Sequence, residues 1–264
     1  MPSLRLNGID LHYAVSGEGP PLLLLAGLLS DSASWGPLVP LLSAHHQVIR
    51  PDNRTTGRTQ PWDAPVTIAQ MAEDAAALMP ALGHEHYHVA GHSMGGLIAM
   101  ELSALSKLRS LQILCSAPVR VPRTMAMFET LVEIRAGAED PSLWLRALYP
   151  WAFQPKFFET PAKVEAAVMA ALAYPYAQSL PAMRLQIEAL RSYRPDVKPR
   201  DIKVPTQVLF AEHDLMIPQA PARAVFADID GVQMHEVPNA GHSVHWDAPE
   251  ATAQYILSFT GATI

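Results

Sequence analysis

A serine between glycines, at the junction of a strand-like run and a helix-like run, constrains the fold of this chain more than any other feature. Residues 91–96 read Gly-His-Ser-Met-Gly-Gly, after the β-prone run 86–90 and before the helix-forming run 97–102. Such a tight turn needs neighbours without side chains, because a Cβ there would collide with the adjoining chain. The pattern predicts that Ser93 lies on a strained strand-to-helix turn, with its hydroxyl above a sheet and free helical N–H groups beside it.

Other segments predict an alternation of strands and helices around this turn. Asn7-Gly8 lies between two alternating runs, which predicts a hairpin, and the apolar run 22–26 predicts a central parallel strand. Thr67 begins a T-x-x-Q pattern that predicts a helix N-cap, and Gly83 is expected to end that helix. We therefore predict an α/β fold with a doubly wound, mostly parallel sheet and one antiparallel hairpin at its start.

Residues 119–200 interrupt this alternation. They show helical periodicity, almost no β pattern and many of the aromatic residues of the chain. We interpret them as a helical cap inserted into a core made of residues 1–118 and 201–264. Most aromatics at helical spacing should fill the small core of the cap itself. A cap that excludes water also needs an apolar underside, and Trp144 and Trp151 are the candidates for lining a substrate pocket there.

A serine hydroxyl attacks a carbonyl only with a base in hydrogen-bonding reach, so the chain must supply one if Ser93 is a nucleophile. The β-rich run 204–214 ends in the carboxylate of Asp214, and His242 follows Asn-Ala-Gly in the loop after the strand-like run 232–237. The order Ser93, Asp214, His242 is compatible with a Ser–His–Asp triad on an α/β sheet. His245, three residues further on, is the rival base.

These segments resemble the α/β-hydrolase family over nearly the whole chain, from Gly27-Leu28 through Ser93 to Gly241-His242. Within that family the chain looks most similar to serine hydrolases of the 3-oxoadipate enol-lactonase and aminoacrylate-hydrolase types. The resemblance implies that Ser93 is the nucleophile, that His242 is the base because Gly241 precedes it where the family places its base, and that Asp214 is the carboxylate. Glu212 and Asp247 are the rival carboxylates, and His92 is expected to be structural.

The resemblance also implies an oxyanion hole made by the backbone N–H groups of Leu28 and Met94. Two departures from the family pattern concern the loops around this site. Ala26 stands where relatives often have a histidine that braces the loop, and the segment 52–59 has Thr55 in place of a glycine and Thr59 in place of a serine. These departures concern the conformation of the loops, while the three triad residues are all present.

The expected reaction is hydrolysis of a carboxylic ester, a lactone or a similar activated carbonyl through an acyl-serine intermediate, with a small, partly apolar acyl group under the cap. Three alternatives stay open: C–C bond hydrolysis of a β-diketone by the same triad, perhydrolysis at the same site, and a non-catalytic ligand-binding protein on the same fold. A chromogenic ester distinguishes the enzyme from the binding protein.

Composition excludes several other classes. The 264 residues are 49% hydrophobic, carry a net charge of −6 and include no Lys/Arg cluster, so we expect no nucleic-acid binding. No apolar run is long enough to span a membrane, and the N-terminus does not resemble a signal peptide, which predicts a cytoplasmic protein. Cys115 is the single cysteine and has no partner for an internal disulfide. A homo-oligomer stays open.

No metal or other cofactor is expected. His84, His86 and His88 alternate as if on one strand face, which is a pattern that binds metals, but no fourth ligand stands with them. The chain also has no Gly-rich phosphate loop. The expected partner is therefore a small-molecule substrate alone.

Overall fold

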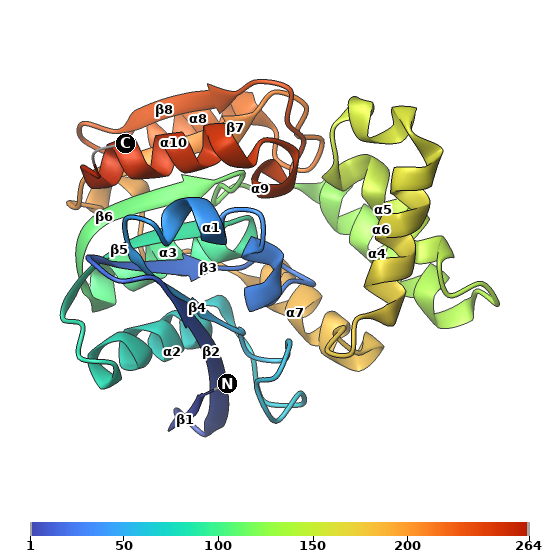
Figure 1. Cartoon of the computed structure of the whole chain (residues 1–264), viewed down its shortest axis with the longest axis horizontal. Helices are drawn as coiled ribbons and strands as arrows, with labels where there is room; N and C mark the ends of the chain where they lie inside the picture. The colour runs from blue at the N-terminus through green and yellow to red at the C-terminus, as the bar shows by residue number, and fades with distance from the viewer. Residues whose placement is uncertain (1, 263–264) are drawn as a thin grey trace.

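Eight strands pair into a single sheet, and helices cover both of its faces (Figure 1). The computed structural model describes residues 2–262. The strands are β1 (Ser3–Leu6), β2 (Ile9–Ser16), β3 (Pro21–Leu25), β4 (Gln47–Pro51), β5 (His86–His92), β6 (Lys107–Leu114), β7 (Thr206–Ala211) and β8 (Gln233–Val237). Their spatial order is β1-β2-β4-β3-β5-β6-β7-β8, with β2 antiparallel to β1 and β4 and the remaining pairs parallel. The predicted doubly wound, mostly parallel sheet is confirmed.

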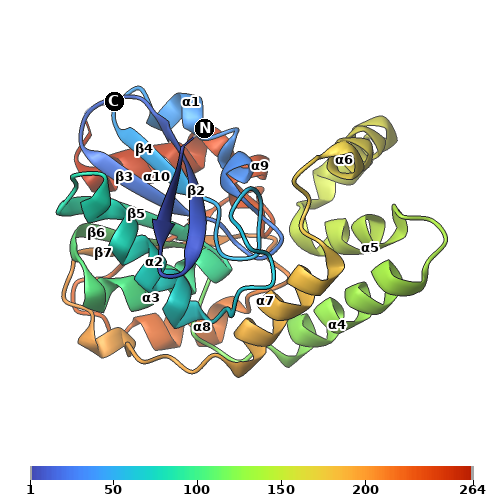
Figure 2. The ribbon, with the colours of Figure 1, turned by 90° about the horizontal axis from the view of Figure 1, so that it is seen from below.

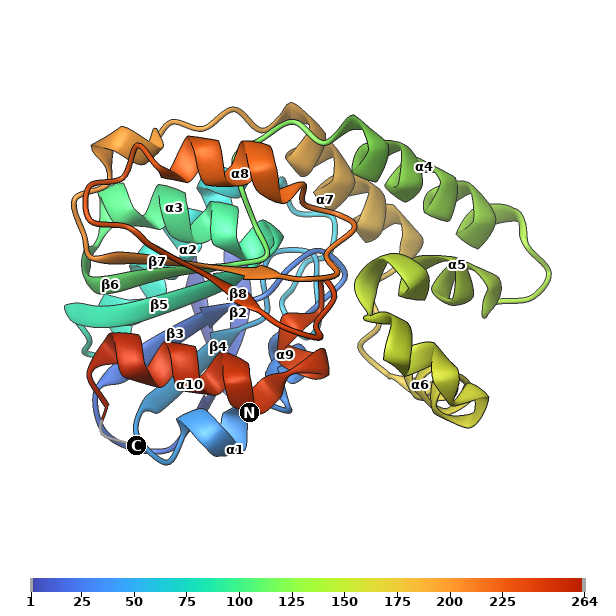
Figure 3. The same cartoon turned by 90° about the horizontal axis from the view of Figure 1, so that it is seen from above.

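Both faces of the sheet are apolar, and each face has its own layer of helices. In β3, Leu23 and Leu25 pack in the cluster that includes α2 (Ile68–Ala81), α3 (Met94–Leu105) and α8 (Gln219–Phe226). Leu22 and Leu24 pack in the cluster that includes α1 (Val39–Leu42) and α10 (Pro249–Thr260). Figure 3 shows the two layers on opposite sides of the sheet. A strand covered on both faces buries successive side chains, which explains the unbroken run of leucines.

Two local signals in the sequence are confirmed by backbone geometry. Asn7 and Gly8 both have positive φ, at 47° and 81°, as a two-residue hairpin turn between β1 and β2 requires. The Thr67 side chain accepts a hydrogen bond from the backbone N–H of Gln70 at 3.1 Å, which caps α2, and Gly83 follows the end of that helix with φ of 85°.

Between β6 and β7 the chain forms helices in place of strands. These are α4 (Pro122–Gly137), α5 (Leu143–Ala152), α6 (Pro161–Ala173) and α7 (Leu180–Ser192), with short 3-10 helices at Pro155–Glu159 and Pro199–Asp201. Figure 2 shows α4–α7 grouped at one side of the core. This segment is the inserted helical cap; its division from the core at residues 119 and 200 stays a prediction. None of the helices in the described part of the chain has the length and apolar character needed to span a bilayer.

Hydrogen bonds fasten the cap to two core loops. The Tyr174 hydroxyl donates to the Asp31 carboxylate at 2.6 Å, in the loop after β3. The Gln178 side-chain amide donates to the backbone oxygen of Thr55 at 3.0 Å, and that of Gln186 donates to the backbone oxygen of Arg54 at 2.8 Å, both in the loop after β4. The cap therefore lies against the same end of the sheet to which the turn at Ser93 belongs, because β3, β4 and β5 are parallel neighbours.

Candidate active site

Ser93 lies between the last residue of β5 and the first residue of α3, in a strained backbone conformation with φ of 53° and ψ of −121°. A non-glycine residue at positive φ persists only where the surrounding structure enforces it. The glycines do so here: a Cβ on Gly91 would collide with the carbonyl of Gly95, and a Cβ on Gly95 would collide with the carbonyl of Leu25. The predicted strand-to-helix turn is therefore present, with the Ser93 side chain partly exposed.

The structure brings Ser93, His242 and Asp214 together into one hydrogen-bonded chain. His242 Nε2 lies 2.8 Å from Ser93 Oγ. On the other side of the ring, His242 Nδ1 lies 3.1 Å from Asp214 Oδ1 and 3.0 Å from Oδ2. Since a carboxylate only accepts, Nδ1 carries a proton in this arrangement, and Nε2 is left free to accept the proton of the Ser93 hydroxyl.

The Asp214 carboxylate is almost fully buried, with 2% of its side chain exposed, yet it is held in the charged form. Burial by itself raises its pKa, but the charge and hydrogen bond of His242 and the backbone N–H groups of Ile217 and Met216 outweigh burial and leave the pKa below its usual range. Those two N–H groups donate to Asp214 Oδ1 at 3.1 and 2.8 Å. Asp214 therefore has a fixed orientation toward His242.

The rival residues lie elsewhere. His245 is buried against Trp35, with a ring-centroid distance of 5.0 Å, and its Nδ1 has no hydrogen-bond partner in the described residues. Burial, with the neighbouring imidazoles of His92 and His242, lowers the pKa of His245 well below its usual value. Glu212 is exposed and accepts the backbone N–H of Asn239 at 2.8 Å. Asp247 accepts backbone N–H groups and makes no hydrogen bond to the His242 ring.

His92, next to the serine, is buried and holds the backbone of the histidine loop. Its Nε2 lies 2.7 Å from the carbonyl oxygen of His242, and because a carbonyl only accepts, Nε2 is the protonated nitrogen. Burial, reinforced by the nearby charge of His242, lowers the pKa of His92 to about 3, so the ring is neutral at ordinary pH. This contact is structural, in agreement with the prediction from sequence.

The two amides expected to form an oxyanion hole lie beside Ser93 and are unused. Within residues 2–262, neither the Leu28 nor the Met94 backbone N–H donates a hydrogen bond. Met94 is the first residue of α3, where an N–H has no intrahelical acceptor. The loop that carries Leu28 is close to the serine, since a Cβ built on Gly27 would lie 3.1 Å from Ser93 Cβ. Both residues therefore belong to segments next to Ser93, and their role as an oxyanion hole stays a prediction.

Asn53 braces this loop, and sequence reasoning did not find it. Its side-chain amide donates to the Ala26 carbonyl oxygen at 3.0 Å and is buried. Asp52, its neighbour, accepts the backbone N–H of Ser32 at 2.8 Å and that of Arg58 at 2.8 Å. The brace that Ala26 lacks as a side chain is therefore supplied from the segment 52–59. The available signal was the position of this polar segment directly after the β4 strand.

Thr55, which replaces a glycine of the family pattern, nevertheless adopts φ of 67°. A β-branched residue in this region is strained. The cap contacts this strained residue, since the Gln178 side-chain amide donates to the backbone oxygen of Thr55 at 3.0 Å. Thr59, the second departure, accepts the backbone N–H of His12 at 3.0 Å and donates to the backbone oxygen of Asp52 at 2.6 Å. The loop therefore keeps a defined conformation despite both substitutions.

The two tryptophans proposed for the pocket occupy different places. Trp151 belongs to the apolar cluster that joins the cap to Leu28 and Ile217 of the core, next to the site. Trp144 packs in the small core of the cap with Leu145, and the Arg135 guanidinium lies 4.5 Å from the centre of its ring. Helical spacing alone does not show which face of a cap helix turns toward the core, and a pocket role for either tryptophan stays a prediction.

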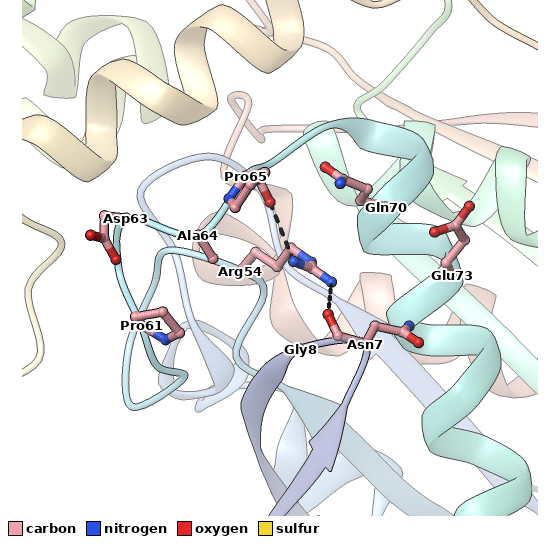
Figure 4. Close-up of a pocket in the computed structure, with 9 residues that line it drawn as sticks. All are labelled: Asn7, Gly8, Arg54, Pro61, Asp63, Ala64, Pro65, Gln70 and Glu73. Atoms are coloured by element: carbon pink, nitrogen blue, oxygen red, sulfur yellow. Dashed lines mark hydrogen bonds between the residues drawn. The ribbon is translucent and has the colours of Figure 1, made fainter.

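A separate hollow of about 480 Å³ lies away from Ser93, between the β1–β2 hairpin, the loop 61–65 and the start of α2 (Figure 4). The Arg54 side chain crosses it, but its donors are already used by the Asp74 carboxylate, at 2.5 and 2.9 Å, and by backbone oxygens of Asn7 and Pro65, at 2.9 and 3.3 Å. Four of the five N–H donors of the guanidinium are therefore taken within the protein, and a single N–H on Nη1 is left for any ligand there.

The histidines considered for a metal site are dispersed. His88 is buried with its Nδ1 2.8 Å from the Ser110 hydroxyl, whereas His86 is exposed and His84 precedes β5. In residues 2–262 no group of three or more His, Cys, Asp or Glu side chains has an arrangement that could hold a metal ion. Cys115 is buried at the end of β6, and burial raises the pKa of its thiol well above the usual value.

Comparisons with known proteins agree with this architecture. The chain is 31% identical over 269 residues to the "Putative carbamate hydrolase RutD" of Azorhizobium caulinodans, covering 99% of this chain and 98% of the relative. The crystal structure of the enol-lactonase from Burkholderia xenovorans LB400 has a TM-score of 0.85 at 25% identity, covering 98% of this chain and 100% of that chain. A thermophilic esterase from Thermogutta terrifontis has a TM-score of 0.79 at 24% identity, covering 97% and 95% of the two chains, and shows likeness of fold alone.

A family model described as the alpha/beta hydrolase family matches residues 22–255. This match begins at the strand before Gly27, contains the turn at Ser93, the cap and Asp214, and extends past the loop of His242. The sheet order, the inserted cap and the match together show that the chain belongs to the alpha/beta hydrolase family of enzymes.

Proposed function

We propose that this protein is a serine hydrolase that cleaves a carboxylic ester, a lactone or a similar activated carbonyl through an acyl-serine intermediate. The observation that carries the proposal is the unbroken chain from Asp214 through His242 to Ser93 Oγ, with a last distance of 2.8 Å. The backbone N–H groups of Leu28 and Met94, in segments next to Ser93, have no acceptor in the described residues and support the proposal as candidate oxyanion donors. These are the parts that acyl transfer needs: a nucleophile, a base held in one tautomer and donors for an oxyanion.

In the first half of the proposed reaction, His242 Nε2 takes the Ser93 proton while Oγ attacks the substrate carbonyl. Negative charge develops on the carbonyl oxygen, where the amides of Leu28 and Met94 stabilise it. The buried Asp214 carboxylate stabilises the imidazolium that forms. His242 then gives the proton to the leaving alcohol, which departs and leaves an acyl group on Ser93. A water molecule repeats the sequence and releases the acid.

The apolar surroundings of the site support a substrate with a partly apolar acyl group. The cluster that closes over Leu28, Leu29 and Ile217 is made of aliphatic and aromatic side chains of the cap, among them Trp151. Burial of an alkyl group against such side chains contributes about 0.8 kcal/mol per methylene. We therefore expect short alkyl esters to be cleaved more efficiently as the acyl chain grows from two to about four carbons.

Two relatives suggest how the substrate class divides. The relative from Azorhizobium is named a carbamate hydrolase, and the neighbour from Burkholderia is an enol-lactonase. A carbamate would be a second candidate substrate for the same site. Attack by Ser93 would then give a carbamoyl-serine, which water releases more slowly because the nitrogen lone pair reduces the electrophilicity of its carbonyl. A steady state after the burst that is much slower with a 4-nitrophenyl carbamate than with the ester would identify the carbamoyl-serine.

The test of the nucleophile uses 4-nitrophenyl butyrate. We expect a burst of nitrophenol equal to the enzyme concentration, labelling of Ser93 by a serine-directed phosphonate, and a loss of about 10⁴- to 10⁶-fold in kcat for Ser93→Ala. Ser192→Ala, which removes an exposed hydroxyl at the end of α7, is the matched control and should retain wild-type kcat. Undiminished hydrolysis by Ser93→Ala would end the proposal.

The choice of base is tested with one substitution at two positions. His242→Gln should lower kcat by about 10⁴-fold, because glutamine cannot take the serine proton. His245→Gln should change kcat by less than about tenfold, since this ring packs against Trp35 and does not reach Ser93 in the structure. The reverse order of effects would transfer the role of base to His245.

A further inference from the structure

The backbone around His242 is held at three consecutive residues by three different parts of the molecule. The N–H of Gly241 donates to Asp247 Oδ2 at 2.8 Å. The carbonyl oxygen of His242 accepts from His92 Nε2 at 2.7 Å, and the N–H of Ser243 donates to the Ala152 carbonyl oxygen at 2.7 Å. The last of these acceptors belongs to the cap, at the end of α5. The histidine loop is therefore bonded to the cap directly.

Asp247 makes a second bond of the same kind. Its Oδ2, which accepts from Gly241, also accepts from the backbone N–H of Gln154 at 2.9 Å. One carboxylate oxygen thus joins Gly241, the residue before His242, to Gln154 of the cap, which lies 93 positions before Asp247 in sequence. The two backbones are in contact at this point, since a Cβ on Gly241 would lie 2.7 Å from the carbonyl carbon of Phe153. This contact explains the glycine before the histidine.

The Asp247 carboxylate makes no ion pair in the described residues. Burial raises its pKa, the N–H groups of Gly241 and Gln154 lower it in part, and no cation lies within 4 Å of it in the described residues. A carboxylate accepts from backbone N–H groups more strongly than a neutral oxygen does. The partly buried Asp247 carboxylate accepts one N–H from the histidine loop and one from the cap, and it therefore fixes these two segments relative to each other.

We propose, on the basis of the proposed serine hydrolase function, that Asp247 is a positioning residue that couples the cap to the catalytic base. The carboxylate links Gly241 to Gln154, and the N–H of Ser243 is bonded to Ala152. The position of the His242 backbone therefore follows the position of cap residues 152–154. Any displacement of the cap at these residues would therefore also displace the imidazole that faces Ser93. A misplacement of about 1 Å in such a group costs up to about 100-fold in rate.

The sharpest test breaks the bond between Asp247 and the cap at its cap end. Gln154 has φ of −65° and ψ of 158°, and Phe153 has φ of −113° and ψ of 154°, so the backbone angles at position 154 suit proline. Gln154→Pro replaces the N–H that Asp247 accepts with a ring carbon, which displaces the carboxylate, whereas Gln154→Ala deletes the side chain and keeps the N–H. The difference between these two variants therefore reports the loss of the Gln154–Asp247 hydrogen bond together with the displacement of the carboxylate. Asp247→Ala removes both bonds, and Asp247→Asn keeps an oxygen that accepts them.

The measurement is kcat per active site for 4-nitrophenyl butyrate, with active sites counted by phosphonate titration. We expect Gln154→Pro to be slower than Gln154→Ala by about tenfold, Asp247→Ala slower than wild type by about 10- to 100-fold, and Asp247→Asn within about fivefold of wild type, with KM changed by less than about threefold. Asp228→Ala, on the exposed turn after α8, is the unchanged control.

The outcomes separate this inference from the function on which it rests. A purely structural role for Asp247 would lower the number of titratable sites and leave kcat per site unchanged, which would overturn the inference. Equal kcat per site in Gln154→Pro and Gln154→Ala would overturn it as well, even if Asp247→Ala does not fold. In either case the inactivity of Ser93→Ala would leave the serine hydrolase proposal standing, and full activity of Ser93→Ala would end both.

Discussion

Replacing Asp214 by asparagine should trap His242 in the wrong tautomer. Asp214 Oδ1 accepts the backbone N–H groups of Met216 and Ile217 at 2.8 and 3.1 Å, so the single oxygen of an asparagine is held at that place. Its NH₂ group then faces His242 Nδ1, where the carboxylate now accepts at 3.0 Å. A donor there requires a bare Nδ1, and the proton must sit on Nε2, facing Ser93. Such an imidazole cannot take the serine proton.

The magnitude follows from losing the base while the nucleophile, the oxyanion donors and the fold are kept. A wrong-tautomer histidine in a Ser–His–Asp site costs about 10⁴-fold in kcat. At about 1.4 kcal/mol per factor of ten, this is about 5 kcal/mol of transition-state stabilisation. KM should change little, because Asp214 is buried behind the imidazole and has 2% of its side chain exposed.

The assay is kcat per titrated active site for 4-nitrophenyl butyrate, with thermal unfolding to show that the variant is folded. Glu212→Gln, at the neighbouring exposed carboxylate, is the matched control and should stay within about twofold of wild type. A loss below about tenfold for Asp214→Asn, or a large loss for Glu212→Gln, would refute the tautomer argument and the assignment of the carboxylate.

The same substitution has a signature in stability against pH. The folded-state pKa of Asp214 lies below its usual value, so ionised Asp214 stabilises the folded state above the unfolded pKa, which is about 3.9. This stabilisation is lost as pH falls through the lower, folded pKa. Wild type should therefore lose stability relative to Asp214→Asn as pH falls below about 4 in urea titrations. A gap that is independent of pH would contradict the proposed charge state.

Two further predictions concern stability. Gly95→Ala should lower the free energy of unfolding by about 3 kcal/mol, or Tm by about 6 to 12 °C, because the new Cβ meets the Leu25 carbonyl. Gly137→Ala is the comparison: this glycine has open space around it at the end of α4, so the substitution should raise the free energy of unfolding by about 0.5 to 1 kcal/mol. Equal effects in the two variants would contradict the packing of the turn. Arg54→Leu should cost about 3 to 5 kcal/mol in urea unfolding, because it leaves the Asp74 carboxylate buried at 4% exposure without its cation, and Arg54→Leu combined with Asp74→Leu should recover part of that loss. Strict additivity of the two substitutions would argue against the pair.

Local signals in the sequence were sufficient for the sheet and the turn. The Asn7-Gly8 hairpin, the Thr67 cap of α2 and the strained position of Ser93 each depend on φ preferences and hydrogen bonds within about four residues. The apolar run 22–25 depends on the covering of both faces of one strand. These interactions join residues close in sequence, so they can be recognised from the sequence. They also determine the order in which strands and helices follow one another along the chain.

The tertiary structure decided which side chains meet beyond the triad that the family resemblance implied. His242 and His245 are three positions apart; the resemblance favoured His242, and in the structure the bond of His242 to Ser93 and the packing of His245 against Trp35 separate them. The hydrogen bond from Asn53 to Ala26 spans 27 positions, and the hydrogen bond from Gln154 to Asp247 spans 93. Contacts at such separations depend on where helices and loops pack around the sheet, and this packing cannot be predicted from the positions of the two residues along the chain. For the same reason Trp144 and Trp151 look equivalent in sequence and lie in different clusters.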